Sequence, residues 1–148
     1  MITAERYHDI SCGHRVYGHE SKCAHLHGHN YRVTFKIKGD ASEDNQGGLD
    51  AVGRVLDFSV IKTLLCQWLE DNWDHKFLLW YKDPWADHLY QIDRKGLVLV
   101  PFNPTAENMA QHLLDTVGPK QLLGTECTLI SVKIEETRKC SASAELFV

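Results

Sequence analysis

Apolar and polar residues alternate strictly along residues 31–38. The apolar positions of this run are Tyr31, Val33, Phe35 and Ile37. Successive side chains of a β-strand point to opposite faces, so this run predicts a strand with one buried face, as in an antiparallel sheet. Residues 128–137 alternate in the same way, and residues 97–100 are a short apolar run before a proline. We therefore expect three strands.

Two other segments repeat apolar residues at helical spacing. The first covers residues 60–69, with Asp57 or Ser59 as its expected N-cap. Thr105 is the expected N-cap of the second helix, and Gly118-Pro119 is its expected stop. Strand, helix, strand, helix, strand with antiparallel-type alternation predicts an α+β fold, in which an antiparallel sheet carries both helices on one face.

Composition limits the classes of protein that remain. With 148 residues, 43% of them hydrophobic, the chain is expected to form a single domain over 1–148. A net charge of -4 argues against a nucleic-acid binder that relies on a broad basic face. No apolar run is long enough for a membrane span, and no signal peptide is recognisable. Five scattered cysteines without a C-x-x-C pair predict reduced thiols in a cytoplasmic protein.

The stretch C-A-H-L-H-G-H-N-Y, residues 23–31, carries the most chemistry. His27 and His29 share the parity of the apolar residues that follow, so they project from one face with only Gly28 between them. Two imidazoles on one face make half of a zinc site. Cys23 lies upstream of the alternation, where its thiol could act as a base or nucleophile instead of a ligand.

A third ligand decides between a structural and a catalytic metal site. His14, in S-C-G-H-R, is the best candidate, because a preceding hairpin arm could lie beside the 27–29 strand. Three histidines leave a fourth position open for water or substrate, which is typical of catalytic zinc. A structural zinc site would need a fourth protein ligand. Surface histidines near a turn remain the simple alternative.

Six short blocks carry a resemblance that spans residues 10–137. They are I-S-C-G-H-R-V, K-C-A-H-L-H-G-H-N-Y, V-L-D-F, W-D-H-K, N-P-T-A-E-N and I-E-E-T. In this order the chain resembles the 6-pyruvoyl-tetrahydropterin synthase family. The C-x3-H-G-H spacing is similar to the bacterial branch, the 6-carboxy-5,6,7,8-tetrahydropterin synthases of the 7-deazaguanine (queuosine precursor) pathway. The resemblance implies the tunnelling fold and a homohexameric barrel with sites between subunits.

The resemblance also implies a role for each matching residue. The implied zinc ligands are His14, His27 and His29, the catalytic residues are Cys23, Asp74 and His75, and the substrate-binding residues are Glu136, Thr105 and Glu107. The implied reaction converts 7,8-dihydroneopterin triphosphate to 6-carboxy-5,6,7,8-tetrahydropterin and releases acetaldehyde and triphosphate. The pyruvoyl-forming reaction of the same family is an alternative, as is a non-catalytic module that binds zinc or a pterin.

Each role has a simpler explanation that structure must test. Cys23 could be a small packed thiol, and Asp74-His75 a helix end whose histidine favours the dipole. Thr105 is a helix cap in any case, and the acids at 107 and 136 could be solvated. Residues 80–94 are expected to be a local elaboration that lines or covers the site. S-A-S-A-E at 141–145 lacks the tryptophan that the family commonly has there.

Overall fold

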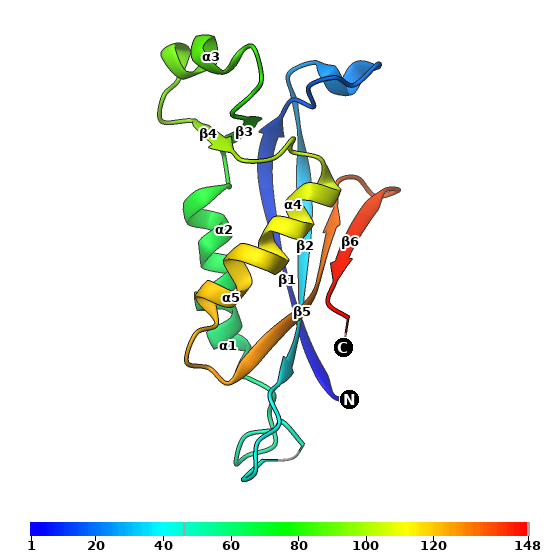
Figure 1. Cartoon of the computed structure of the whole chain (residues 1–148), viewed down its shortest axis with the longest axis vertical. Helices are drawn as coiled ribbons and strands as arrows, with labels where there is room; N and C mark the ends of the chain where they lie inside the picture. Colours follow the sequence, from blue (N-terminus) through cyan, green and yellow to red (C-terminus); the bar gives the residue numbers. More distant parts are fainter. Residues whose placement is uncertain (46, 148) are drawn as a thin grey trace.

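Six strands form one curled sheet in the computed structural model, which describes residues 1–45 and 47–147 (Figure 1). The spatial order is β4-β3-β1-β2-β5-β6. The strands are β1 (Thr3–His14), β2 (His27–Gly39), β3 (Phe77–Trp80), β4 (Leu97–Val100), β5 (Cys127–Glu135) and β6 (Ser141–Glu145). All three predicted strands are present, and the 31–38 run belongs to β2.

The long antiparallel pair β1–β2 is the centre of the sheet. Its register runs without interruption from Thr3 opposite Lys38 to His14 opposite His27. β5 pairs antiparallel with the other edge of β2, with a bulge between Lys36 and Ile37. The alternation of β2 therefore continues back to His27, and the predicted placement of His14 on a neighbouring hairpin arm is correct.

The sheet is not antiparallel throughout. β3 pairs parallel to the end of β1 and β4 pairs parallel to β3, while the β1–β2, β2–β5 and β5–β6 pairs are antiparallel. Two parallel strands require a crossover connection, which returns the chain to the end of the sheet where the first strand began. Helical segments provide this crossover before each of the two short strands, and an apolar run of four residues does not reveal its direction.

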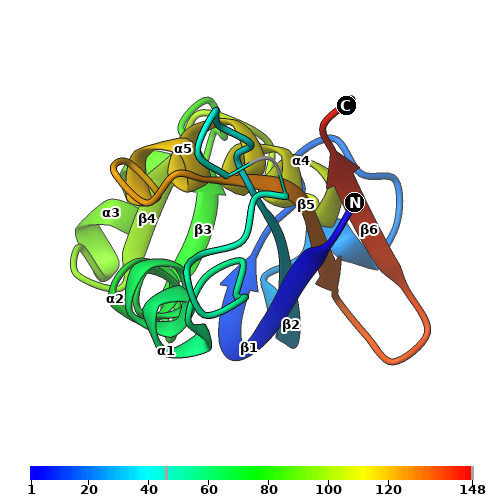
Figure 2. The ribbon, with the colours of Figure 1, turned by 90° about the horizontal axis from the view of Figure 1, so that it is seen from below.

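Both long helices cover the same face of the sheet, as predicted (Figure 2). The first comprises α1 (Phe58–Ile61), the π-helical segment η2 (Lys62–Cys66) and α2 (Gln67–Asn72); the second comprises α4 (Ala106–His112), the π-helical segment η3 (Leu113–Val117) and α5 (Gly118–Gln121). The buried side chains of Tyr31, Val33, Phe35 and Ile37 in β2 share one core with both helices. The helices contribute Ile61, Leu65, Met109 and Leu113 to it.

Local signals predicted the helix starts correctly and one helix end wrongly. The Asp57 side chain accepts a hydrogen bond from Ser59 N (2.9 Å), and the Thr105 hydroxyl accepts one from Asn108 N (3.1 Å). Gly118-Pro119 does not stop the second helix, which continues to Gln121. The preceding π turn changes the hydrogen-bond register, so the missing N–H of Pro119 falls where the pattern is already interrupted. Gly118 instead permits close packing, since a Cβ there would overlap the Leu129 side chain.

Two small elements lie at the end of the sheet where β1 stops. They are the short turn η1 (Lys22–Ala24) and α3 (Ala86–Ile92), which belongs to the 80–94 elaboration. Residues 40–45 and 47–54 lie at the opposite end, the lower tip in Figure 1. Within the described ranges, no helix is long and apolar enough to cross a membrane.

Candidate metal centre and the adjoining cleft

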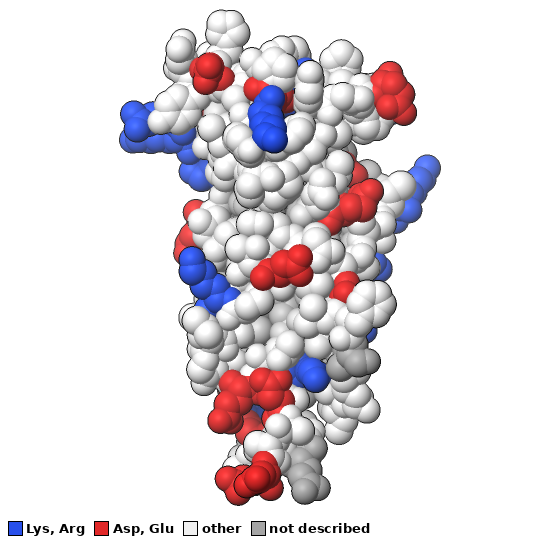
Figure 3. Space-filling model, viewed as in Figure 1, with Lys and Arg blue, Asp and Glu red and all other residues white. Residues whose placement is uncertain are grey.

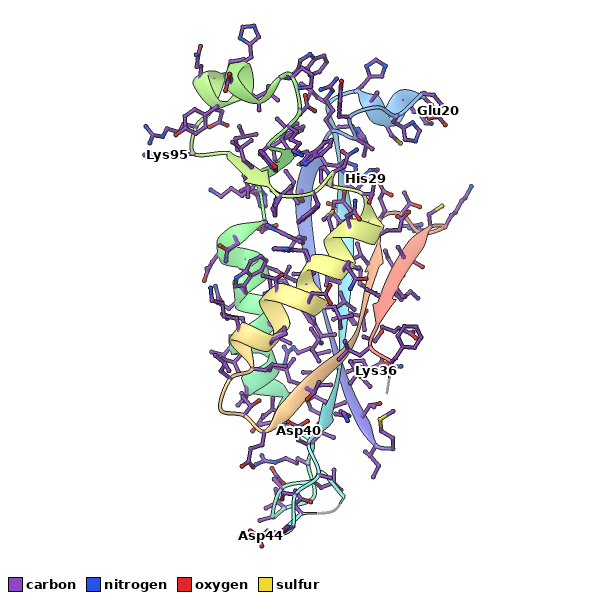
Figure 4. All side chains as sticks on the ribbon, viewed as in Figure 1. Glu20, His29, Lys36, Asp40, Asp44 and Lys95 are labelled. Atoms are coloured by element: carbon purple, nitrogen blue, oxygen red, sulfur yellow. The ribbon has the colours of Figure 1, made fainter. Side chains whose placement is uncertain are left out.

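Three histidines and one carboxylate converge at the end of the β1–β2 pair. One ligand atom from each of His14, His27, His29 and Glu136 lies within 4.8 Å of the other three. The Nε2 atoms of His14 and His27 are 3.0 Å apart, and His29 Nε2 is 2.8 Å from Oε1 of Glu136. Figure 4 shows His29 in the upper part of the sheet. The cluster thus takes His14 from β1, two histidines from β2, and Glu136 from just beyond β5.

Backbone carbonyls hold two of the imidazoles in one orientation. His14 Nδ1 is 2.6 Å from Pro104 O, and His27 Nδ1 is 2.8 Å from His25 O. A carbonyl oxygen only accepts hydrogen bonds, so each Nδ1 is the protonated nitrogen and donates. The Nε2 lone pairs of both rings then face the cluster. Metal-ligating histidines are commonly oriented in this way.

Burial favours the neutral form of the imidazoles. Burial lowers the pKa of His14, although the Pro104 carbonyl and the Glu136 carboxylate oppose this shift. Burial also lowers the pKa of His29, against the opposing effect of Glu136. A metal ion binds neutral imidazole, so these rings do not have to lose a proton before binding at neutral pH.

The donor set suits a divalent transition metal. His29 Nε2 is buried, and its nearest polar neighbour in the described chain is Oε1 of Glu136 at 2.8 Å. The Nε2 lone pair can be directed at a cation. Imidazole nitrogens with one carboxylate oxygen are typical ligands of zinc and of other divalent transition metals. The cluster could therefore hold a metal, and it includes Glu136, which the sequence analysis assigned to substrate.

A cleft of about 820 Å³ adjoins the cluster. His29, Asp74, His75 and Glu136 contribute to its lining. Asp74 accepts a hydrogen bond from Ser11 N (2.9 Å), and its other oxygen lies 2.7 Å from His75 Nδ1. Burial by itself would raise the pKa of Asp74, but the hydrogen bonds from Ser11 and His75 outweigh it and lower the pKa.

His75 is presented to solvent by an unusual backbone conformation. Its φ is 58°, in the left-handed region, and its side chain is 79% exposed. A non-glycine residue pays roughly 1 kcal/mol or more for this conformation. The His75 backbone N–H donates to Ser11 O (2.7 Å), and Ser11 N donates to the Asp74 carboxylate. Ser11 of β1 therefore holds the backbone of both residues in place. The structure thus brings Asp74 and His75 to the cleft beside the histidine cluster.

The other predicted site residues lie outside the lining of this cleft. Cys23 is half-buried in η1, and within the described chain its thiol makes no hydrogen bond to Asp74 or His75. Burial raises the pKa of Tyr31, and the neighbouring Cys12, Glu136 and Cys23 add to this shift. Thr105 caps α4, and Glu107 is exposed on its first turn.

Three groups at the cluster were missed by sequence reasoning. The Pro104 and His25 carbonyls orient the histidines, but every residue has a carbonyl, so no sequence signal marks them. Tyr31 lies beside the cluster, with its ring centroid 5.4 Å from that of His29. Its parity with His29 could have indicated this position. Its buried hydroxyl has no hydrogen-bond partner in the described residues.

Comparison with known proteins decides the family. The family model of 6-pyruvoyl tetrahydropterin synthase matches residues 3–146. This chain belongs to that family. A 6-carboxy-5,6,7,8-tetrahydropterin synthase of Rickettsia felis is 32% identical to it, over 95% of this chain and 97% of the relative. One from Haemophilus influenzae is 28% identical, over 93% of this chain and 94% of the relative.

Solved structures share the fold. An uncharacterized protein, WS1659 of Wolinella succinogenes, superposes with a TM-score of 0.78 at 22% identity, covering 97% of both chains. The 6-pyruvoyl tetrahydropterin synthase of Caenorhabditis elegans gives 0.63 at 22% identity, covering 99% of this chain and 96% of that one. The expected α+β tunnelling fold, a curled six-stranded sheet with helices, is confirmed.

Proposed function

We propose that this family member is a zinc-dependent 6-carboxy-5,6,7,8-tetrahydropterin synthase. Its reaction would convert 7,8-dihydroneopterin triphosphate and water to 6-carboxy-5,6,7,8-tetrahydropterin, acetaldehyde and triphosphate. The cluster of His14, His27, His29 and Glu136 beside the Asp74–His75 cleft carries the proposal. Relatives that bear this name align along nearly the whole chain and support the choice.

The histidines are suited to hold the metal that such a reaction needs. Their Nε2 atoms converge, and carbonyl acceptors fix two of the rings. A bound zinc ion would supply Lewis-acid polarisation of the substrate's side-chain hydroxyl groups. Glu136 follows the apolar face of β5, and its carboxylate is 25% exposed, so it can reach the cleft. We assign it the N2/N3 edge of the pterin, which donates two hydrogen bonds.

Proton transfer falls to the remaining predicted residues. Asp74 accepts the Nδ1 hydrogen of His75, which leaves Nε2 of the imidazole to take or give a proton in the cleft. Cys23 is proposed as the thiolate base that removes a proton from the substrate side chain. Because Cys23 does not line the cleft of its own chain, assembly into a homohexamer would supply the pairing from a second copy. Thr105 and Glu107 remain predicted pterin neighbours.

Product identity tests the proposal most directly. Zinc-loaded protein is incubated with 7,8-dihydroneopterin triphosphate, and the products are separated and weighed by mass spectrometry. We expect 6-carboxytetrahydropterin together with acetaldehyde. A pyruvoyl product without acetaldehyde would assign the chain to the other branch of the family. Unchanged substrate from a fully zinc-loaded protein would leave only the binding-module alternative.

A pair of cysteine variants tests the catalytic assignment. Cys23→Ala should abolish turnover and retain zinc, because the thiol is not one of the clustered ligand atoms. Cys140→Ala is the matched control, since Cys140 is an exposed thiol on the strand connection before β6. Turnover of Cys23→Ala at the rate of the control would remove Cys23 from the mechanism.

A further inference from the structure

An arginine that follows a metal-binding histidine directly is buried. Arg15 is 8% exposed, and its guanidinium donates a hydrogen bond to Asp83, which is 3% exposed. The same Asp83 oxygen accepts a hydrogen bond from Trp85 N (2.8 Å), while the other oxygen has no partner in the part of the chain that the structure describes. Arg15 is therefore the charge that compensates this buried carboxylate.

The guanidinium also reaches two other segments. Its Nε donates to Ala24 O (2.9 Å), in the η1 turn that carries Cys23, and its Cζ lies 3.5 Å from the centroid of the Trp85 ring. The neighbouring Val16 N donates to Cys23 O (3.1 Å). The Cys23 and Ala24 carbonyls of η1 thus both accept hydrogen bonds from the two residues that follow His14.

We propose that Arg15, Asp83 and Trp85, here called the arginine clamp, position the Cys23 turn relative to the metal-binding histidines. This inference rests on the proposed function, because it assigns Cys23 a catalytic task. The clamp connects the end of β1, the η1 turn and the 80–94 elaboration, which becomes part of the active-site scaffold although it lies outside the lining of the cleft.

The choice of side chains agrees with positioning more than with stability. A buried ion pair is often no more stable than apolar residues of similar volume, because desolvation offsets the attraction. A guanidinium can, however, satisfy a carboxylate, a carbonyl and an aromatic face at once from one rigid plane. Lysine keeps the charge but has no fixed plane, so it cannot hold all three partners in the same geometry. Arg15→Lys is therefore the informative variant.

The experiment compares zinc-loaded wild type, Arg15→Lys and Arg54→Lys. Arg54 is the matched control, since it is an exposed arginine paired with Asp50 and Asp57 near the opposite tip. For Arg15→Lys we expect kcat to fall by roughly 10- to 100-fold, as small misplacements of reacting groups can cause. KM and zinc content should stay close to wild type. The kcat is expressed per folded, zinc-loaded subunit, because an unfolded fraction would lower the apparent kcat and leave KM unchanged.

Thiol reactivity gives a second measurement that does not depend on turnover. The rates at which iodoacetamide alkylates Cys23 and the exposed Cys140 are followed by peptide mass spectrometry in the same sample. The Cys23 to Cys140 ratio should change by roughly threefold or more in Arg15→Lys, because thiol reactivity depends on its surroundings. It should not change in Arg54→Lys. A folded Arg15→Lys protein with wild-type kcat and an unchanged ratio would overturn the proposal.

Trp85→Ala decides the matter if Arg15→Lys does not fold. Trp85 is 41% exposed, so its truncation leaves no large internal cavity, yet it removes the face against which Arg15 lies. We expect shifts of kcat and of the alkylation ratio in the same direction, but smaller. Unchanged values would overturn the clamp. If the wild type forms no pterin product, the proposed function fails, and the alkylation ratio still tests the clamp separately.

Discussion

The two ends of the molecule both gather ionisable side chains, but they hold them in different ways. Asp40 and Asp44 are exposed near the lower tip (Figure 4), where acidic side chains gather (Figure 3). Asp50 accepts hydrogen bonds from Arg54 and Val52 N, and Asp57 accepts one from Ser59 N, so these partners are near neighbours in sequence. Asp40, which accepts a hydrogen bond from the Thr128 hydroxyl (2.5 Å), is the exception. At the other end, the histidine cluster joins residues as distant as His14 and Glu136.

Buried polar atoms without a partner follow the same division. Throughout residues 1–45 and 47–147 there are three such side-chain atoms: His29 Nε2, Tyr31 Oη and Asp83 Oδ2. His29 belongs to the histidine cluster, Tyr31 lies beside that cluster, and Asp83 belongs to the arginine clamp. A buried polar atom left unpaired destabilises the folded chain. The difference teaches that the chain gives up stability at the end where ligands are expected to bind, and not at the tip.

Removal of a clustered histidine should separate the two ends most strongly. We expect His14→Ala to weaken zinc binding by more than about 100-fold, beyond the loss typical of an outer-shell partner, and to abolish turnover. Bound zinc is measured by elemental analysis after dialysis. Asp50→Ala, at the tip, serves as the control and should retain zinc and activity. Equal zinc retention by both variants would contradict the metal site.

The unpaired hydroxyl of Tyr31 should be a measurable cost. Tyr31→Phe removes it and keeps the ring, so the free energy of unfolding of the metal-free protein should rise by about 1–2 kcal/mol. Urea denaturation measures this change. Destabilisation by the variant would show that the hydroxyl is satisfied in the folded protein. A loss of turnover in a more stable protein would identify the hydroxyl as a group used by the bound substrate.

Near the tip, the N-cap of α1 should contribute measurably to the free energy of unfolding. Asp57→Ala removes the N-cap of α1, and we expect the free energy of unfolding to fall by about 1 kcal/mol. Zinc content should not change. Asp57→Asn, which retains an acceptor oxygen for Ser59 N, should lose much less. Thermal unfolding of the two variants provides the comparison, and equal losses would argue against the cap.

The smallest expected effect is a pH dependence away from both ends. Burial lowers the pKa of His112, with Asp115 opposing, so the unfolded chain binds a proton near pH 6.5 when the folded chain does not. Stability is therefore present above about pH 6.5 and is lost as the pH falls towards the lower folded pKa. We expect less than about 1 kcal/mol, because the ring is partly solvated. Urea midpoints at several pH values should vary less in His112→Gln.

Local signals in the sequence predicted what local interactions determine. The alternation of β2 placed His27, His29 and the core residues on one face, and both N-caps lie at predicted residues. The direction of β3 and β4 was not predictable, because pairing partners are chosen by the crossover. The helix stop at Gly118 was predicted wrongly, because packing against Leu129 selected that glycine.

The candidate site was predictable only in part, for a similar reason. Parity and a hairpin arm sufficed to bring His14 opposite His27. The carbonyls of Pro104 and His25 and the contact of Arg15 with Asp83 join residues through the backbone or across long sequence distances. No pattern of residue types marks such contacts. The position of Glu136 against His29 likewise depends on how β5 pairs with β2.

The sequence distance within the cluster has a consequence for the order of events during synthesis. The β1–β2 hairpin contains the three histidines of the cluster and is complete by Gly39, whereas Glu136 lies near the end of the chain. At roughly 5–20 residues per second, a ribosome would expose the histidines several seconds before the carboxylate. A metal ion captured by the nascent hairpin would meet nitrogen ligands alone, and the oxygen would arrive only when the C-terminal part of the sheet closes.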